Sequence, residues 1–180
     1  MERNQGDQLP AIILTQLDAQ LRILDEQIDA IEKEILNYIN KNDSLKKTFD
    51  CLKSIPGIGE ISGAIVLQYI GERGLLFETA EKFCGYAGLY PSEHQSGQSK
   101  GQAFLTHKGN RRLRRIFYMC ACAMISRSGM WKRYYDAKLE TGKKPKQILI
   151  AMACKLAKLC WTLAHTQTSF KGGIFMPSYA

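Results

Sequence analysis

A heptad repeat near the start of the chain constrains the fold more than any other feature of the sequence. Apolar residues recur from position 14 at alternating spacings of three and four, and neither Gly nor Pro interrupts the pattern. The stripe consists of Leu14, Leu17, Leu21, Leu24, Ile28, Ile31, Ile35, Tyr38 and Leu45, with Asn42 and Phe49 at the later a positions. This spacing predicts a coiled-coil helix of about 36 residues, in which Asn42 is a buried polar residue that fixes the register.

A single helix of this kind cannot bury its apolar stripe. We expect a second copy of the chain to cover it, which makes residues 1–50 a leader and a coiled-coil dimerisation helix. An antiparallel helix elsewhere in a larger complex is the alternative partner.

The segment Leu52–Leu67 has the composition of two short helices joined by a tight turn. Pro56 should end the first helix, and Gly57, Ile58 and Gly59 should form the turn, since glycine accepts positive φ and allows a close backbone approach. The pattern resembles the helix-hairpin-helix motif, whose turn holds a nucleic-acid phosphate on the free amides of the second helix. The simpler alternative is a Gly-Pro turn between two core helices.

Charge divides the chain into an acidic start and a basic remainder. The net charge is +8, yet residues 1–50 carry six basic and ten acidic side chains, whereas residues 51–180 carry nineteen basic and seven acidic ones. A surplus this one-sided indicates a polyanionic partner. A basic surface that is merely solvated is the alternative.

The six cysteines lack the spacing of a metal or redox site. The sequence has no Cys-x-x-Cys pair and no zinc-finger histidine spacing, so we expect buried thiols in a reducing compartment and no metal site. We find no signal-peptide pattern and no apolar run near the ~20 residues of a membrane-spanning helix. The sequence therefore predicts a cytoplasmic protein without a membrane partner.

Residues 88–101 form the most polar and glycine-rich stretch and are predicted to be a loop. The stretch contains Ser96, a candidate nucleophile, which would need a base or a metal to become reactive. His94 is the candidate base within the loop, and Lys100 with the loop glycines could stabilise phosphate charge. On composition alone, an exposed turn serine is the simpler interpretation.

A basic helix is predicted to follow this loop, with Asn110 as its N-cap. Lys108 precedes it, and an arginine cluster occupies its first turns: Arg111, Arg112, Arg114 and Arg115. Four cations at a helix start oppose the helix dipole, which is a local cost without a structural return. Because the guanidinium fork suits phosphate, we expect the cluster to bind nucleic acid.

The whole pattern predicts an all-α protein: a long N-terminal coiled-coil helix followed by a compact helical domain with a helix-hairpin-helix motif. Further helices are expected at 79–86, with Phe83 and Tyr86 buried, at 131–139 and at 145–165. The compact domain is assigned to residues 51–170 and an irregular tail to residues 171–180.

Four motifs, taken in order, resemble the C-terminal half of insertion-sequence transposases of the 110/116/902 type, which are related to the Piv DNA invertase. The motifs are Ile55–Gly59, Phe83–Ser92 leading into Gln95–Gly97, Thr106–Arg114 and Lys143–Ile150. The resemblance covers nearly all of the chain after the first dozen residues, and the heptad helix matches the coiled coil that precedes this domain in the family.

The resemblance implies a serine recombinase guided by a bridge RNA. In that family an N-terminal domain with four acidic residues holds magnesium, and the C-terminal domain supplies a serine that forms a phosphoserine link to DNA. Many members have two adjacent serines before the glycine of the second motif; here Gln95 replaces the first, so Ser96 is the match. The acidic domain is absent from this chain, and no cofactor is expected in it.

These expectations combine into a transposase fragment that binds DNA, with a structured guide RNA as a further candidate partner, but does not cut DNA alone. The glycine turn, the arginine cluster and the serine loop should face the same polyanionic strand. One alternative is a non-catalytic nucleic-acid-binding adaptor or regulator that dimerises through its coiled coil. Another is a structural dimer that scaffolds other proteins.

Overall fold

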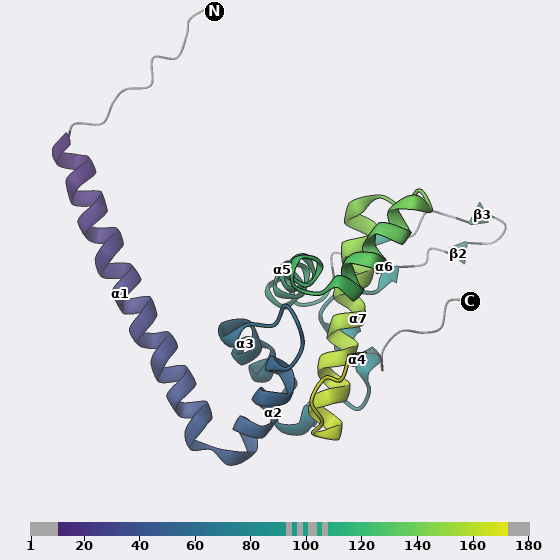
Figure 1. The fold of residues 1–180 in the computed structure, drawn as a ribbon, viewed down its shortest axis with the longest axis horizontal. Helices are drawn as coiled ribbons and strands as arrows, with labels where there is room; N and C mark the ends of the chain where they lie inside the picture. The colour runs from purple at the N-terminus through teal and green to yellow at the C-terminus, as the bar shows by residue number, and fades with distance from the viewer. Residues whose placement is uncertain (1–10, 93–94, 97–98, 101–103, 106–107, 173–180) are drawn as a thin grey trace, which may run out of the picture. The chain divides into compact units, whose positions relative to one another are not determined.

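Helices make up nearly all of the regular structure in the computed structural model, which describes residues 11–92, 95–96, 99–100, 104–105 and 108–172. The helices are α1 (Ala11–Lys41), α2 (Asp43–Lys53), α3 (Glu60–Ile70), α4 (Ala80–Tyr86), α5 (Arg111–Arg127), α6 (Gly129–Glu140) and α7 (Pro145–Thr166), with a 3-10 turn, η1 (Glu72–Gly74), after α3 (Figure 1). The predicted all-α class is confirmed.

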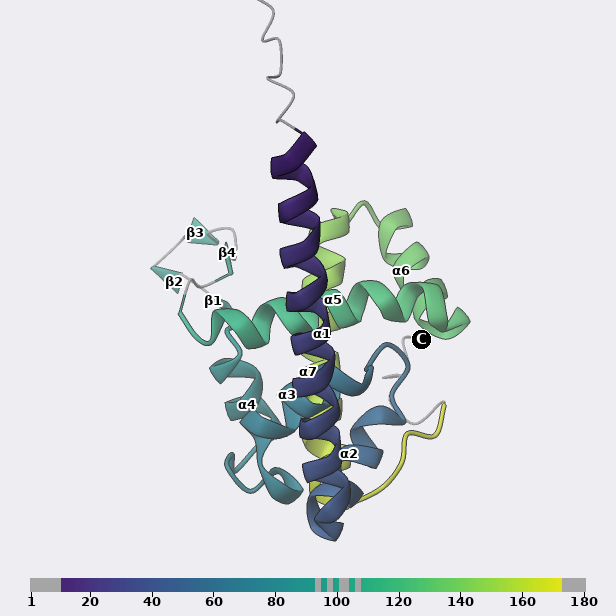
Figure 2. The ribbon, with the colours of Figure 1, turned by 90° about the vertical axis from the view of Figure 1, so that its left-hand side faces the viewer.

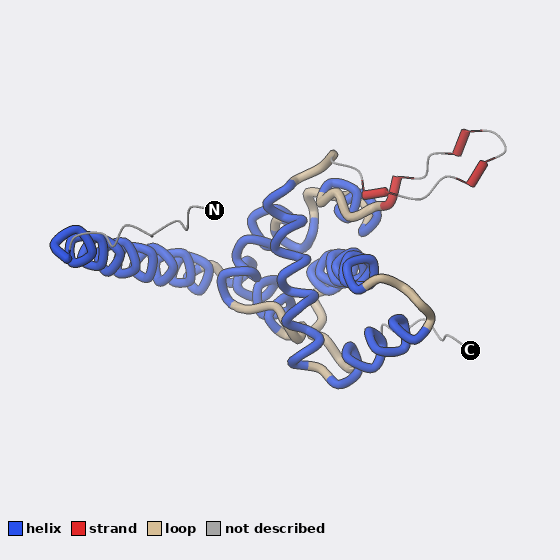
Figure 3. Tube along the Cα trace, turned by 90° about the horizontal axis from the view of Figure 1, so that it is seen from above, coloured by secondary structure: helices blue, strands red, loops and turns tan. Residues whose placement is uncertain are grey.

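Among the described residues, four two-residue strands lie between α4 and α5; three of them fall within residues 88–101, which were predicted to be a loop, and the fourth follows that stretch. β1 (Pro91–Ser92) pairs antiparallel with β4 (Phe104–Leu105), and β2 (Gln95–Ser96) pairs antiparallel with β3 (Ser99–Lys100) (Figure 3). We call residues 91–105 the serine segment. Strands this short leave no alternation of apolar and polar residues for sequence analysis to detect.

The chain divides into two units, residues 1–38 and residues 39–180. In the first, α1 is one helix, and the stripe predicted to form a coiled coil is exposed in the single chain, with 52% of Leu24 and 60% of Ile31 accessible. Pairing of this stripe with a second copy stays a prediction. The described part of the second unit, residues 39–172, is called the helical body below.

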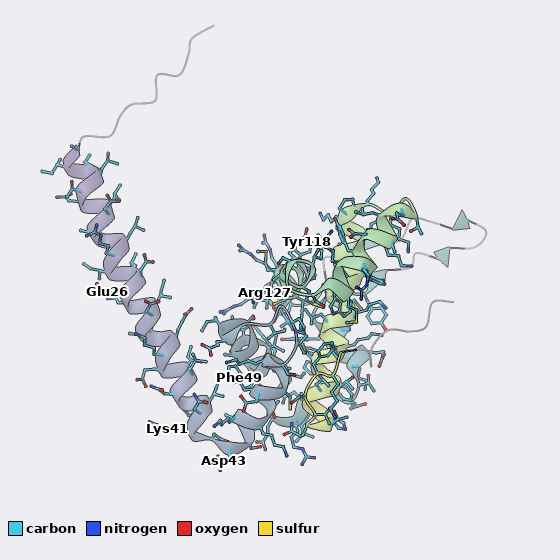
Figure 4. All side chains as sticks on the ribbon, viewed as in Figure 1. Glu26, Lys41, Asp43, Phe49, Tyr118 and Arg127 are labelled. Atoms are coloured by element: carbon cyan, nitrogen blue, oxygen red, sulfur yellow. The ribbon has the colours of Figure 1, made fainter. Side chains whose placement is uncertain are left out.

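The predicted continuation of the heptad helix through Asn42 is wrong. Asn42 has extended backbone angles and is the N-cap of α2, where its side chain accepts a hydrogen bond from Leu45 N at 3.2 Å. Figure 4 labels Lys41 and Asp43 on either side of this break. Asparagine competes for backbone amides, so it favours a cap over a helix interior. Phe49, the last a position, is buried in the helical body.

α7 is the central helix of the body. It contacts α2, α4, α5, α6 and η1, and α5 crosses it at a steep angle (Figure 2). Its buried side chains are Ile148, Met152, Ala153, Leu156, Ala157, Leu159, Cys160, Leu163 and Ala164. By length and composition α7 could span a membrane, which the sequence analysis did not anticipate; half of that stretch is buried inside the body, as in the core helix of a globular protein.

Local signals position the helices around α7. Thr79 caps α4 by accepting from Lys82 N at 3.2 Å, and Asn110 caps α5 as predicted. Phe83 is buried as expected and meets Phe117 edge-on with ring centroids 5.8 Å apart. The prediction that Tyr86 is buried is wrong: 43% of it is exposed, because its hydroxyl accepts a surface hydrogen bond from the Asn110 side chain at 3.3 Å.

Candidate nucleic-acid interface

The turn between α2 and α3 contains the predicted glycines. Gly57 has φ +92°, and Gly59 is the N-cap of α3. The amide of Gly59 donates to Ser62 Oγ at 2.8 Å, so this donor is already satisfied. The amides in the first turn of α3 have no intrahelical acceptor, as in any α-helix.

Gly57 packs against α5. A Cβ placed on Gly57 would lie 2.6 Å from Met124 Cγ and 2.8 Å from the carbonyl oxygen of Cys120, so only glycine fits against this helix. Ile58 is 5% exposed, so a contact between Ile58 and phosphate would involve its backbone. The packing of the turn against α5 explains its sequence without a ligand.

Two cations beside the turn were not anticipated from the sequence. Lys53 pairs with Glu60 at 2.6 Å, which offsets the carboxylate at the start of α3. Arg127 is exposed and lies three residues beyond Met124, on the same side of α5 as the turn. The helical spacing between Met124 and Arg127 could have indicated the second, but only after the contact with Gly57 was known.

The start of α5 presents a second basic surface. Arg111, Arg112, Arg115 and Lys108 are exposed, whereas Leu113 is fully buried beneath them. Arg114 differs from its neighbours: it is half-buried, and its Nη1 donates to the carbonyl of Lys108 at 3.1 Å and to that of Gly88 at 3.4 Å.

The structure brings two of the three expected elements together. The serine segment lies between α4 and α5 in the chain, and the residues that flank it, Gly88 and Lys108, contact Arg114 of the arginine cluster. The glycine turn packs elsewhere: at ~100° per residue, Cys120 and Met124 lie about 180° and 220° around α5 from Arg111. The expectation that one face holds all three elements is therefore wrong, because α5 separates the turn from Arg111 and Arg115.

Ser96 and Lys100 occupy opposite ends of the β2–β3 pairing. Gln95 pairs with Lys100, and Ser96 pairs with Ser99. The candidate base His94 and the glycines at 97 and 101 lie outside the described residues.

The entrance of the serine segment is fixed to the body. Leu89 is buried, and its amide donates to the carbonyl of Cys84 at 3.2 Å. Lys158 of α7 donates to the Tyr90 hydroxyl at 3.3 Å and pairs with Glu81 at 3.0 Å. Hydrogen bonding to Lys158 lowers the pKa of the Glu81 carboxyl, and hydrogen bonding to Glu81 raises the pKa of Lys158.

All six cysteines are free thiols. The closest pair is Cys84 and Cys154, whose sulfur atoms are 2.7 Å apart. Hydrogen bonding from Cys84 lowers the pKa of the Cys154 thiol, while hydrogen bonding to Cys154 and then burial raise the pKa of Cys84. In the described ranges, no group of three or more His, Cys, Asp or Glu side chains could hold a metal ion, so these residues offer no magnesium site.

Comparison with known proteins gives the relatives of this chain. Residues 49–136 match the family model of the IS116/IS110/IS902 transposases. The pilin gene-inverting protein of Moraxella lacunata is 29% identical over 94% of this chain and 53% of its own length. The uncharacterized 42 kDa protein of insertion element IS900 from Mycobacterium paratuberculosis is 28% identical, over 88% of this chain and 39% of its own length.

A third relative is named for its activity. The transposase for insertion sequence element IS1328 of Yersinia enterocolitica is 27% identical over 88% of this chain and 47% of its own length. The chain thus spans about two fifths to a half of these relatives. The matched region runs from the end of α2 to α6 and includes the glycine turn, the serine segment and the arginine cluster. Residues 49–136 are therefore similar to the transposase domain of the IS116/IS110/IS902 family.

Proposed function

We propose that the helical body binds the phosphate backbone of DNA at the start of α5, as part of a transposase or DNA recombinase. The observation that carries this proposal is the exposure of Arg111, Arg112 and Arg115 on the side of α5 opposite its buried face. Exposed arginines that oppose the helix dipole cost stability in the free protein and gain from a phosphate.

The relatives favour DNA over other polyanions. The names of two of them specify inversion of a pilin gene and transposition of an insertion element, and both processes act on DNA. The glycine turn, with Lys53 and Arg127 beside it, is a second phosphate contact in this proposal. Because it lies on another side of α5, it would hold a different part of the duplex or another strand.

The salt dependence of DNA binding tests the proposal. Each phosphate contact that is lost lowers the slope of log K against log salt by about 0.9 for duplex DNA. The triple variant R111A/R112A/R115A should therefore bind more weakly with a slope lower by about 2 to 3. The matched control R22A/K33A/K41A removes the same charge from exposed positions of α1 and should keep the slope.

Ser96 is our candidate for the nucleophile that joins protein to DNA, and magnesium is expected with acidic residues that this chain does not supply. Alone, the chain should bind DNA without cutting it. Incubation with supercoiled DNA, Mg²⁺ and structured guide RNA should yield no covalent protein–DNA product. If a product forms and persists in S96A, Ser96 is not the nucleophile.

The remaining parts of the proposal are a homo-oligomer formed through α1 and a cytoplasmic location. The exposed heptad stripe supports the first, and the nucleic-acid partner supports the second. A non-catalytic adaptor that binds DNA and dimerises is the second candidate function, since the exposed stripe of α1 and the basic start of α5 suit those two tasks. It differs in one result: adding the acidic half of a relative would not restore strand exchange.

A further inference from the structure

The residues that flank the serine segment on both sides meet in one small cluster, which we call the loop clasp. It consists of Tyr86, Gly88, Lys108, Gly109, Asn110 and Arg114. The amide of Asn110 donates to the carbonyl of Tyr86 at 2.7 Å, and the Asn110 side chain donates to the Tyr86 hydroxyl at 3.3 Å. The residue that caps α5 thus also joins the start of α5 to the end of α4.

Two glycines let the two backbone segments of the clasp approach each other. Gly88 and Gly109 both have positive φ, at +68° and +96°. A Cβ on Gly109 would lie 2.7 Å from Cα of Gly88, and a Cβ on Gly88 would lie 2.4 Å from the Lys108 carbonyl oxygen. Neither position can accept a side chain without moving backbone.

Arg114 of α5 is hydrogen-bonded to both backbone segments of the clasp. Its Nη1 donates to the carbonyl of Gly88, which precedes the serine segment, and to the carbonyl of Lys108, which follows it. A Cβ on Gly88 would lie 2.3 Å from this nitrogen, so the guanidinium is in close contact with the backbone here. Arg111, Arg112 and Arg115 are exposed, whereas Arg114 is half-buried.

We propose that Arg114 is a positioning residue that holds together the two chain segments on either side of the serine segment. In this proposal, Arg114 is not one of the phosphate contacts of the arginine cluster. The inference rests on the proposed function for the purpose of the segment, which is to present Ser96. A guanidinium suits the role because its planar group fixes the direction of the two N–H bonds of Nη1, whereas a lysine ammonium is a compact charge on a flexible stem.

The experiment measures two quantities on the 180-residue chain: amide hydrogen exchange and the salt slope of duplex DNA binding. R114A should speed exchange about tenfold in peptides covering 84–90 and 108–114, as expected when two hydrogen bonds that hold these segments together are lost, and leave α7 peptides unchanged. The salt slope should stay at the wild-type value. R115A should do the reverse, lowering the slope by about 0.9 without changing exchange.

Conservative variants separate positioning from charge. R115K should restore the wild-type salt slope that R115A loses, because the positive charge returns. R114K should still exchange nearly as fast as R114A, since the lysine side chain is one bond shorter and more flexible, so that its ammonium does not take the place of Nη1 between Gly88 and Lys108. If R114A does not fold, R114K carries the test.

A glycine variant tests the clasp without changing charge. G109A should speed exchange in the same peptides, whereas the control G85A should not, because nothing lies within 4 Å of a Cβ at Gly85. Unchanged exchange in both R114A and G109A would refute the clasp. A slope lowered by about 0.9 in R114A with normal exchange would make Arg114 a phosphate contact. If the wild-type chain fails to bind DNA, the proposed function fails, and the exchange data still decide the clasp.

Discussion

Gly57 shows how a single residue can satisfy a motif for reasons of packing. The sequence suggested a phosphate-binding turn, and the structure shows that the positive φ and the missing side chain serve contact with Cys120 and Met124 of α5. The two roles are compatible, since amides at the start of α3 still lack intrahelical acceptors. The sequence could predict that glycine was required here but not which surface required it.

Substitution at the two turn glycines should have unequal effects. G57A forces a left-handed residue into contact with α5 and should lower the free energy of unfolding by about 2 to 4 kcal/mol. G59A should cost less than about 1 kcal/mol, since φ is −93° and its Cβ would meet only Ser62 Oγ at 3.8 Å. Urea unfolding monitored by circular dichroism measures both, and equal losses would contradict the packing of Gly57 on α5.

Cys154 should be the most reactive of the partly exposed thiols. Its pKa is lowered by hydrogen bonding from Cys84, whereas burial raises the pKa of Cys122, which is also partly exposed. Because the thiolate is the nucleophile, iodoacetamide at pH 8 should modify Cys154 before Cys122. Mass spectrometry of the peptides follows both rates. C84A should slow modification of Cys154, and full unfolding should make the two rates similar; faster modification of Cys122 in the folded chain would oppose the assignment.

The ends of the helices follow residue-level signals to different degrees. Asn110 and Pro145 mark the starts of α5 and α7 as the sequence predicts, because capping and proline geometry act locally. The break at Asn42 escaped prediction because an uninterrupted apolar repeat runs through it. Which side of that break Phe49 packs on depends on the tertiary structure of the helical body.

Asn42 can be tested as a cap. N42L would improve a continuous heptad helix, but in this structure it removes the hydrogen bond to Leu45 N and should destabilise the body by about 1 kcal/mol. The control N37A lies at an exposed position inside α1 and should have a small effect of either sign. Thermal unfolding measures both variants; a stabilised N42L would favour the continuous helix.

In the candidate site, too, the sequence predicts local features but not contacts between residues far apart in the chain. Basic composition predicted the exposed surface at the start of α5, and Arg111, Arg112 and Arg115 lie on it. Nothing local distinguishes Arg114 from them, because its role depends on Gly88, which lies 26 residues earlier in the chain.

At the scale of the whole molecule, the chain combines an acidic helix with an unpaired apolar stripe and a basic helical body. The stripe predicts self-association. I28D should lower the oligomeric state in sedimentation velocity, because it places a charge at an a position. The control I23D makes the same change at an exposed position outside the stripe and should leave the oligomer intact. A wild-type chain that sediments as a monomer would exclude this mode of association.

The similarity to transposases and the distribution of charge both support one proposal, that the start of α5 binds the phosphates of DNA. The most direct test is the affinity of the wild-type chain, R111A/R112A/R115A and R22A/K33A/K41A for one DNA duplex, measured by fluorescence anisotropy at several salt concentrations. We predict a steep salt slope for the wild-type chain and the α1 control, and a slope lower by about 2 to 3 for the α5 variant. Equal slopes in all three proteins would contradict the claim.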